Sequence, residues 1–309
     1  MRPRNRHLRR LHRCVQPRGS KDSAGSHCPT MRSASTVIHE ETPTWFTRAI
    51  GHRPASSKVT VDGADIHYLT WGHVGQPGLV FVHGGAAHAQ WWSFLAPFFA
   101  SEWRIAALDL SGHGDSDRRK KYSHTTWANE VMAVAEAASI TAPPIIVGHS
   151  LGGMVTIQVG HAFADRIAGI VIVDSPVRRP DPESEAGSTG RTFRRPGTYP
   201  DLETAMKRFR LIPRQPCDNK YIVDHIARHS LVETESGWTW KFDPQVFVRT
   251  MVGLSNELAS IETRVALIRG DLSVVVPPDM AAYMYQLMGR RAPVISIPEA
   301  HHHLILDQP

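Results

Sequence analysis

The sequence predicts an α/β fold: a mostly parallel central sheet flanked by helices, with a helical cap inserted after the sixth strand. Short apolar runs rich in Val, Ile and Leu alternate with longer helical segments over residues 58–174, as in chains that build parallel sheets. This alternation stops after Asp174 and resumes near Val265, which predicts an insertion between them. A length of 309 residues and a hydrophobic content of 41% are enough for one large domain with such an insertion.

The ordered part of the chain is expected to begin with a short helix and a hairpin. The helix is expected near Trp45–Ile50. The strands Lys58–Val61 and Ile66–Trp71 flank Asp62-Gly63, and an Asp-Gly pair in this position is typical of a two-residue hairpin turn.

The other core strands are short and apolar, and a polar turn or a helix follows each of them. The strands expected before the insertion are Leu79–Val82, Arg104–Leu108, Ile145–Val147 and Ile167–Val173. The helices expected between them are Gln90–Ala100, Thr126–Ile140 and Leu151–Ala164. After the insertion we expect a strand at Val265–Arg269, a helix at Pro278–Met288 and a strand at Val294–Ile297. Ligands of such sheets bind at the carboxyl ends of the strands, so functional residues are expected there.

The insertion over residues 175–262 is predicted to be a helical cap. Its first part, residues 175–200, is rich in Pro, Gly, Arg and Ser, as is typical of a linker or loop. Helices are expected near Leu202–Leu211, Tyr221–Leu231 and Pro244–Leu258. The predicted core therefore comprises residues 58–174 and 263–309.

Basic residues are concentrated at the N-terminus. Residues 1–32 contain nine Lys or Arg and one acidic residue, whereas residues 33–309 contain 26 basic and 28 acidic residues. The formal net charge of +6 therefore comes from the tail, and no nucleic-acid partner is expected for the folded domain. We predict a disordered basic extension over residues 1–35. It could contact anionic partners or direct the chain to an organelle, but we favour a start at Met31, with residues 1–30 outside the functional protein.

The composition also bears on compartment and on cofactors. No stretch approaches the roughly 18 consecutive apolar residues of a membrane span, and no apolar N-terminal segment is typical of a secretory signal. The three cysteines, Cys14, Cys28 and Cys217, form neither a zinc-binding pattern nor a disulfide framework. We therefore expect a cytoplasmic protein with no metal and no cofactor.

The segment Gly148-His149-Ser150-Leu151-Gly152-Gly153 joins a predicted strand to a predicted helix. The pattern G-x-S-x-G in this context is typical of a nucleophile elbow, a strained turn that holds a serine oxygen above the sheet. Side chains two positions before and after the serine would clash there, which explains Gly148 and Gly152. We predict Ser150 as the nucleophile, and we interpret His149 as a packing residue.

A second motif, His83-Gly84-Gly85, ends the strand Leu79–Val82. Glycines at a strand end let a backbone N–H approach a ligand closely. The first residues of the helix after Ser150 also present free N–H groups. We assign an oxyanion hole to the N–H groups of Gly85 and Leu151.

Together these motifs resemble the α/β-hydrolase fold family with a helical cap, over residues 58–309. The turn formed by Asp109, Gly112, Gly114 and Ser116 is similar to the structural loop of that family. The resemblance implies a serine nucleophile, a histidine base after the last strand and an acid at another strand end. Relatives usually carry a helix after the histidine segment, so we expect the chain to be a fragment or to dispense with that helix.

The C-terminal segment Ile297–Pro309 is similar to the family's histidine pattern. Alignment on its two prolines puts His302 at the position of the base and Asp307 at an acidic position, with His301 and His303 as alternatives for the base. A run of three histidines is otherwise typical of a metal-binding tract or a solvated stretch. Adjacent side chains point in different directions, so at most one of the three is expected to serve the site.

The acid is the weakest match to the family. Many relatives have an aspartate three residues after a glycine at the penultimate strand end, and here Ser273 stands at that distance from Gly270. A serine cannot stabilise an imidazolium as a carboxylate does. Two residues could replace it: Asp174, at the end of the strand before the cap, and Asp271. We favour Asp174, whose alternative role is to cap the loop that follows it.

These residues predict a serine hydrolase that cleaves a carboxyl ester or related acyl compound through an acyl-enzyme. Its partner is expected to be a small-molecule acyl substrate, and the sequence leaves the oligomeric state open. A serine nucleophile argues against haloalkane dehalogenases and epoxide hydrolases of this fold, which carry aspartate there. One alternative is a carbon–carbon bond or lactone hydrolase of the same fold. The other is a non-catalytic ligand-binding receptor, which is suggested by Ser273 at the position where many relatives have the acid.

Overall fold

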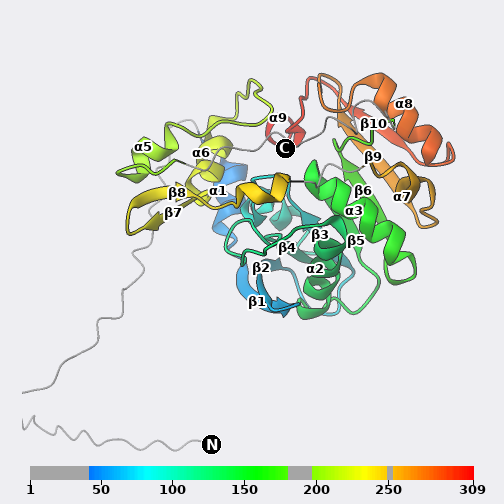
Figure 1. The fold of residues 1–309 in the computed structure, drawn as a ribbon, viewed down its shortest axis with the longest axis horizontal. Helices are drawn as coiled ribbons and strands as arrows, with labels where there is room; N and C mark the ends of the chain where they lie inside the picture. The colour runs from blue at the N-terminus through cyan, green and yellow to red at the C-terminus, as the bar shows by residue number, and fades with distance from the viewer. Residues whose placement is uncertain (1–41, 180–196, 249–252) are drawn as a thin grey trace, which may run out of the picture. The chain divides into compact units, whose positions relative to one another are not determined.

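The computed structural model describes residues 42–179, 197–248 and 253–309, and its main feature is an eight-stranded sheet (Figure 1). The strand order is β1-β2-β4-β3-β5-β6-β9-β10. Strand β2 is antiparallel to both neighbours, and the strands from β4 to β10 in this order pair in parallel. The strands are β1 (Ala55–Val61), β2 (Ala64–Trp71), β3 (Gly78–Val82), β4 (Arg104–Leu108), β5 (Ile145–His149), β6 (Gly169–Val173), β9 (Val265–Gly270) and β10 (Val294–Ile297). The predicted α/β fold with a mostly parallel sheet is confirmed, and the predicted extension over residues 1–35 lies outside the described residues.

The first two strands form the hairpin that the Asp-Gly pair predicts. Asp62 and Gly63 have positive φ values of 46° and 75°, the backbone geometry of a turn that matches the twist of the strands. Val61 pairs with Ala64 directly beside this turn. Helix α1 (Thr44–Gly51) precedes the hairpin, close to its predicted position.

Alternate residues of the central strands point to opposite faces of the sheet, and each face has its own apolar cluster. In β3, Val80 and Val82 belong to one cluster, whereas Leu79 and Phe81 belong to the other. The first cluster includes residues of α2 (His124–Ala137), α3 (Leu151–Ala162), α7 (Ser255–Ala259) and α8 (Pro278–Leu287). The second includes residues of α1, α6 (Lys220–His229) and α9 (Leu304–Asp307). In Figure 1, α2 and α3 lie in front of the strands that they cover.

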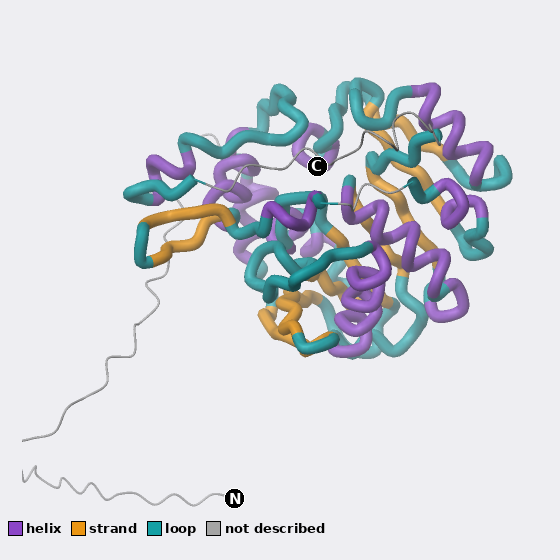
Figure 2. Tube along the Cα trace, viewed as in Figure 1, coloured by secondary structure: helices purple, strands orange, loops and turns teal. Residues whose placement is uncertain are grey.

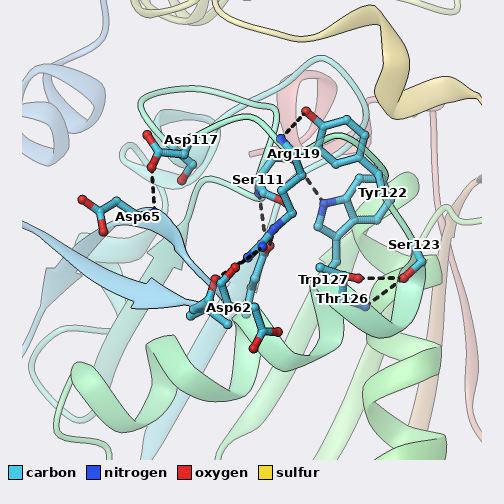
Figure 3. A network of polar contacts seen from close by, with 12 residues as sticks. Asp62, Asp65, Ser111, Asp117, Arg119, Tyr122, Ser123, Thr126 and Trp127 are labelled. Atoms are coloured by element: carbon cyan, nitrogen blue, oxygen red, sulfur yellow. Dashed lines mark hydrogen bonds and ion pairs between the residues drawn. The ribbon is translucent and has the colours of Figure 1, made fainter.

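A partly buried ion pair fixes the chain between β4 and α2, and Figure 3 shows Arg119 among its polar contacts. Arg119 Nε donates to Glu130 Oε1 at 2.9 Å, and its terminal nitrogens donate to the backbone oxygens of Val61 and Asp62. Glu130 also accepts from the N–H of Ser111 at 2.8 Å. Burial raises the pKa of Glu130, and the contacts from Ser111 and Arg119 limit that rise. All of these contacts go to backbone or to buried charge, so this pair is part of the scaffold.

One predicted core helix is wrong. Residues Gln90–Ala100 fold as two 3₁₀ turns, Ala89–Trp92 and Ala96–Phe98. Pro97 lacks an N–H, and its ring would clash with the preceding turn of a continuous α-helix. The two tryptophans of the first turn are buried, so packing against the sheet determines the path of this segment.

The insertion is only partly helical. Helix α5 (Leu202–Met206) lies within a predicted helix, and α6 overlaps the predicted helix Tyr221–Leu231 but begins one residue earlier. However, β7 (Leu231–Thr234) and β8 (Gly237–Trp240) form an antiparallel hairpin, the pair of strands at the left of Figure 2. Gly237 has a φ of 115°, a conformation that requires glycine at this turn. The sequence did not predict this hairpin: the predicted helix Tyr221–Leu231 stops where β7 begins, and no element was predicted between it and Pro244.

The predicted helix Pro244–Leu258 is also wrong. Its described parts are a 3₁₀ turn at Pro244–Phe247 and the short helix α7, and residues 249–252 lie outside the described residues. Leu258 of α7 packs in the same cluster as residues of α3 and α8. This end of the predicted cap therefore packs against the helices on one face of the central sheet.

Candidate active site

Ser150 lies in the turn between β5 and α3, with φ 55° and ψ −118°, a conformation that side chains rarely adopt. The flanking glycines make this turn possible. A Cβ on Gly148 would lie 2.2 Å from the backbone oxygen of Gly152, and a Cβ on Gly152 would lie 2.3 Å from that of Val82. The N–H of Ser150 donates to Val173 O at 3.0 Å, so the neighbouring strand holds the turn in place.

His302 joins Ser150 to Asp174 through hydrogen bonds on both ring nitrogens. Nε2 lies 3.0 Å from Ser150 Oγ, and Nδ1 lies 2.9 Å from Asp174 Oδ1. The three side chains come from the turn after β5, the residue after β6 and the loop after β10, all at the carboxyl edge of the sheet. His302 and Asp174 are buried, whereas Ser150 is half-buried. We refer to these three residues as the His302 chain.

Asp174 is held by three donors in addition to its position in the fold. Its Oδ2 accepts from the N–H of Gly270 at 2.8 Å, and its Oδ1 accepts from Ser273 Oγ at 2.6 Å as well as from the imidazole. Ser273 Oγ in turn accepts from the N–H groups of Val275 and Val276. The serine at the family's usual acid position therefore donates a hydrogen bond to the carboxylate that contacts the imidazole. Sequence analysis missed this role of Ser273.

Asp271 and His301 lie outside the His302 chain. Asp271 is exposed, at the start of the loop after β9. His301 Nδ1 lies 3.3 Å from Asp307 Oδ2, and its backbone N–H donates to the same oxygen at 2.7 Å. Asp307 therefore fastens the loop that carries His302.

The loop after β3 lies beside the turn of Ser150. A Cβ on Gly84 would lie 3.3 Å from Ser150 Cβ, and a Cβ on Gly85 would lie 3.8 Å from Leu151 Cβ and 2.7 Å from the ring of Phe247. Among the described residues, neither the N–H of Gly85 nor that of Leu151 has a hydrogen-bond acceptor. The two predicted oxyanion donors thus lie close together, beside Ser150.

His83 links the loop after β3 to the residues that follow β4. Its Nδ1 donates to Gly84 O at 2.7 Å, and its Nε2 accepts from the N–H of Leu110 at 3.0 Å. These two bonds require a neutral ring, and burial lowers the pKa of His83, which keeps the ring neutral. Sequence analysis noted His83 only as part of the motif and missed this function.

Two more buried histidines surround His302, and sequence analysis missed their proximity. The ring centroids of His149 and His303 lie 4.8 Å and 4.7 Å from that of His302. Burial and the adjacent His302 lower the pKa of His149 to about 3. Burial, with both neighbouring histidines, holds the pKa of His303 well below its ordinary value. Both rings are neutral near pH 7, so His302 has no positive charge from either ring beside it.

Residues 79–309 match the family model described as the alpha/beta hydrolase family. The chain belongs to the alpha/beta hydrolase family. It is therefore a hydrolase, and a hydrolase of this fold implies a small-molecule substrate. In the described ranges, none of the helices has both the length and the apolar character that crossing a bilayer requires.

Curated relatives include enzymes named for different activities. The chain is 23% identical over 254 residues to esterase Rv0045c from Mycobacterium tuberculosis, covering 81% of this chain and 84% of the esterase. It is 33% identical over 123 residues to the dihydrolipoyllysine-residue acetyltransferase component of an acetoin cleaving system from Pseudomonas putida. That match covers 40% of this chain and 33% of the acetyltransferase component, so it involves only part of that protein.

Solved structures share the fold at low sequence identity. The crystal structure of E-2-(acetamidomethylene)succinate hydrolase superposes with a TM-score of 0.71 at 19% identity, over 83% of this chain and 95% of that one. An identity this low supports the fold alone. The expected resemblance to α/β hydrolases is thus confirmed by the family model and by the structure.

Proposed function

We propose that this hydrolase cleaves a carboxyl ester or related acyl compound, with Ser150 as nucleophile, His302 as base and Asp174 as the acid that orients the base. The observation that carries the proposal is the position of the imidazole, 3.0 Å from Ser150 Oγ and 2.9 Å from Asp174 Oδ1. This arrangement activates a hydroxyl that is otherwise a weak nucleophile near pH 7.

In the first step, Ser150 Oγ attacks the carbonyl carbon while His302 Nε2 takes the hydroxyl proton. Asp174 stabilises the imidazolium that forms and keeps Nε2 directed at Ser150. The N–H groups of Gly85 and Leu151 donate to the oxyanion of the tetrahedral intermediate. The imidazolium then gives its proton to the leaving alcohol, and the acyl group remains on the serine.

In the second step, a water molecule attacks the acyl-enzyme, and His302 takes its proton in the same way. Collapse of the second tetrahedral intermediate releases the carboxylic acid and returns the proton to Ser150. The name of the relative from M. tuberculosis, an esterase that the chain matches over most of its length, supports ester cleavage over carbon–carbon bond cleavage.

The experiment that tests the proposal is active-site labelling, since it needs no knowledge of the substrate. The purified chain is treated with a fluorophosphonate, and the modified residue is mapped by mass spectrometry. We expect one adduct, on Ser150, absent from Ser150→Ala and slowed about 10³-fold or more in His302→Gln. His301→Gln, one residue away, is the matched control and should label normally. A folded protein that forms no adduct would contradict the proposal and favour the non-catalytic ligand-binding alternative.

A further inference from the structure

His303 is a buried polar side chain that the proposed mechanism does not use. It is 5% exposed, and neither of its ring nitrogens has a hydrogen-bond partner among the described residues. The backbone at Ile212 comes near the ring without meeting hydrogen-bond geometry. Buried polar atoms without partners are rare in proteins, and each one asks for an explanation.

The ring of His303 lies in a cluster of three imidazoles. One ring nitrogen from each of His149, His302 and His303 lies within 4.8 Å of one from each of the others, and all three residues are buried. The cluster combines one residue of the elbow with two of the C-terminal histidine run. The remaining member of that run, the half-buried His301, contacts Asp307 instead.

Hydrogen bonds fix the tautomer of two of the rings, and with it the nitrogen that keeps a lone pair for a metal. His149 Nε2 contacts the backbone oxygen of His302, which can only accept, so its hydrogen is on Nε2 and its lone pair on Nδ1. His302 Nδ1 donates to Asp174, which leaves the lone pair on Nε2. Imidazoles that bind zinc characteristically donate their other N–H to a carbonyl or a carboxylate in this way.

We infer that His149, His302 and His303 form an inhibitory binding site for a divalent cation that prefers nitrogen ligands, with Zn²⁺ as the best match. Zinc takes three imidazoles and a fourth ligand at about 2.0–2.1 Å, which places the ring nitrogens roughly 3.3 Å apart. The rings must therefore turn to close on the ion, and His303 breaks no hydrogen bond when it turns. The buried carboxylate of Asp174 offsets one of the two positive charges of the cation.

The expected consequence rests on the proposed function. An ion bound to Nε2 of His302 occupies the lone pair that takes the proton of Ser150, so the serine is no longer activated. The half-buried side chain of Ser150 marks the side from which the ion reaches the cluster. Removal of the ion restores the base, and the inhibition is reversible.

The binding test is independent of activity. Untagged Ser150→Ala protein, which keeps all three histidines, is titrated with Co²⁺ and monitored for the visible absorption of a tetrahedral ion, and Zn²⁺ is then added to displace it. We expect one equivalent of Co²⁺ to bind. The affinity for Co²⁺ should fall at least 30-fold when His303→Phe is added and should stay unchanged when His301→Gln is added. Phenylalanine fills the same space, and the melting temperature of His303→Phe verifies that it folds. If that variant is unfolded, His149→Phe replaces it. The absence of tetrahedral absorption, or equal affinity in a folded variant that lacks a cluster histidine, would overturn the proposal.

The inhibition test uses the wild-type protein. Zn²⁺ should slow fluorophosphonate labelling of Ser150 at least tenfold, EDTA should restore it, and His303→Phe should resist inhibition while His301→Gln does not. Normal labelling at saturating Zn²⁺ would contradict the inhibitory role. If Co²⁺ binds in the first test but the metal-free wild-type protein does not label at Ser150, the proposed function is refuted while the metal site is supported.

Discussion

The structure contains two Ser–His–Asp chains of hydrogen bonds with similar distances. In the His302 chain the two bonds measure 3.0 Å and 2.9 Å. In the second, Ser56 Oγ lies 2.9 Å from His67 Nε2, and His67 Nδ1 lies 2.7 Å from Asp109 Oδ2. We refer to Ser56, His67 and Asp109 as the His67 chain. Distances alone do not distinguish a nucleophile from a scaffold.

The surroundings of the two serines differ. Ser56 is exposed on β1, paired opposite Leu69 in regular antiparallel geometry. Ser150 stands on a strained turn beside two N–H groups that have no acceptor among the described residues. Acyl transfer needs donors where the oxyanion develops as well as a base on the hydroxyl. The His302 chain has two candidate donors beside its serine, the N–H groups of Gly85 and Leu151.

The two aspartates differ in what they hold. Asp109 accepts from the N–H of Ala89 at 2.6 Å and from that of Asp115 at 2.9 Å, besides His67. Burial alone would raise the pKa of Asp109, but the hydrogen bond and charge of His67 lower it overall. Asp109 thus ties three segments together, and we interpret the His67 chain as part of the scaffold.

The largest expected effect separates the two serines. Ser150→Ala should lower kcat/KM for an activated ester by about 10⁴-fold or more, because the nucleophile is lost. Ser56→Ala should change it less than twofold. Hydrolysis of p-nitrophenyl acetate by the two purified variants measures both effects. A comparable loss in Ser56→Ala would break the distinction drawn here.

The next effect separates the two acids. Asp174→Asn should lower kcat by about 10³–10⁴-fold. The amide neither stabilises the imidazolium nor holds the neutral imidazole in the tautomer whose Nε2 accepts the proton of Ser150. Asp109→Asn should act mainly on stability, with a loss of about 1–3 kcal/mol from a network whose buried donors are left unpaired. Steady-state kinetics and urea denaturation, applied to both variants, measure the two quantities. Equal stability losses with little change in kcat would contradict the assignment of Asp174.

A smaller effect concerns Ser273, a positioning residue that acts through Asp174. Ser273→Ala removes one donor from the carboxylate and should lower kcat about 3- to 30-fold with KM nearly unchanged. The carboxylate then attracts the imidazolium proton more strongly, so the acidic limb of the kcat profile should move to higher pH. Ser273→Thr, which keeps the hydroxyl, should restore most of the rate. A change in stability with no shift of the pH profile would indicate a purely structural role.

The smallest effect on activity is expected for a buried histidine outside both chains. Burial lowers the pKa of His124 to about 4 in the folded state, from 6.5 in the unfolded chain. Above pH 6.5 both states are neutral and stability is complete. As the pH falls from 6.5 towards 4, only the unfolded chain binds the proton, so this histidine costs about 1.4 kcal/mol of stability per pH unit.

Replacement of His124 by phenylalanine should therefore flatten the acid side of the stability profile by that slope. Urea denaturation at intervals from pH 7 to pH 4 measures it, with kcat at pH 7 as the control for the site. An unchanged slope would mean that the folded state accepts the proton at this position.

Sequence patterns correctly predicted the elements whose conformation depends on interactions between residues close in the chain. The strands of the core, the Asp-Gly turn and the glycines around Ser150 follow from alternation, turn geometry and steric clash within a few residues. The segment Gln90–Ala100 did not follow, because Pro97 and the packing of two tryptophans overrode a weak helical pattern there. The cap hairpin did not follow either, because residues 232–243 show no pattern that predicted a strand.

Sequence alone determined the fold family, the strained serine and a short choice of bases and acids. Tertiary structure decided which carboxylate contacts the imidazole, because Asp174 and His302 are far apart in the chain and meet only when parallel strands align their carboxyl ends. It also placed Ser273 where its hydroxyl donates to Asp174, and it brought His149 beside His303. No local pattern encodes contacts of this kind, since they depend on the order of strands in the sheet and on which side chains burial forces together.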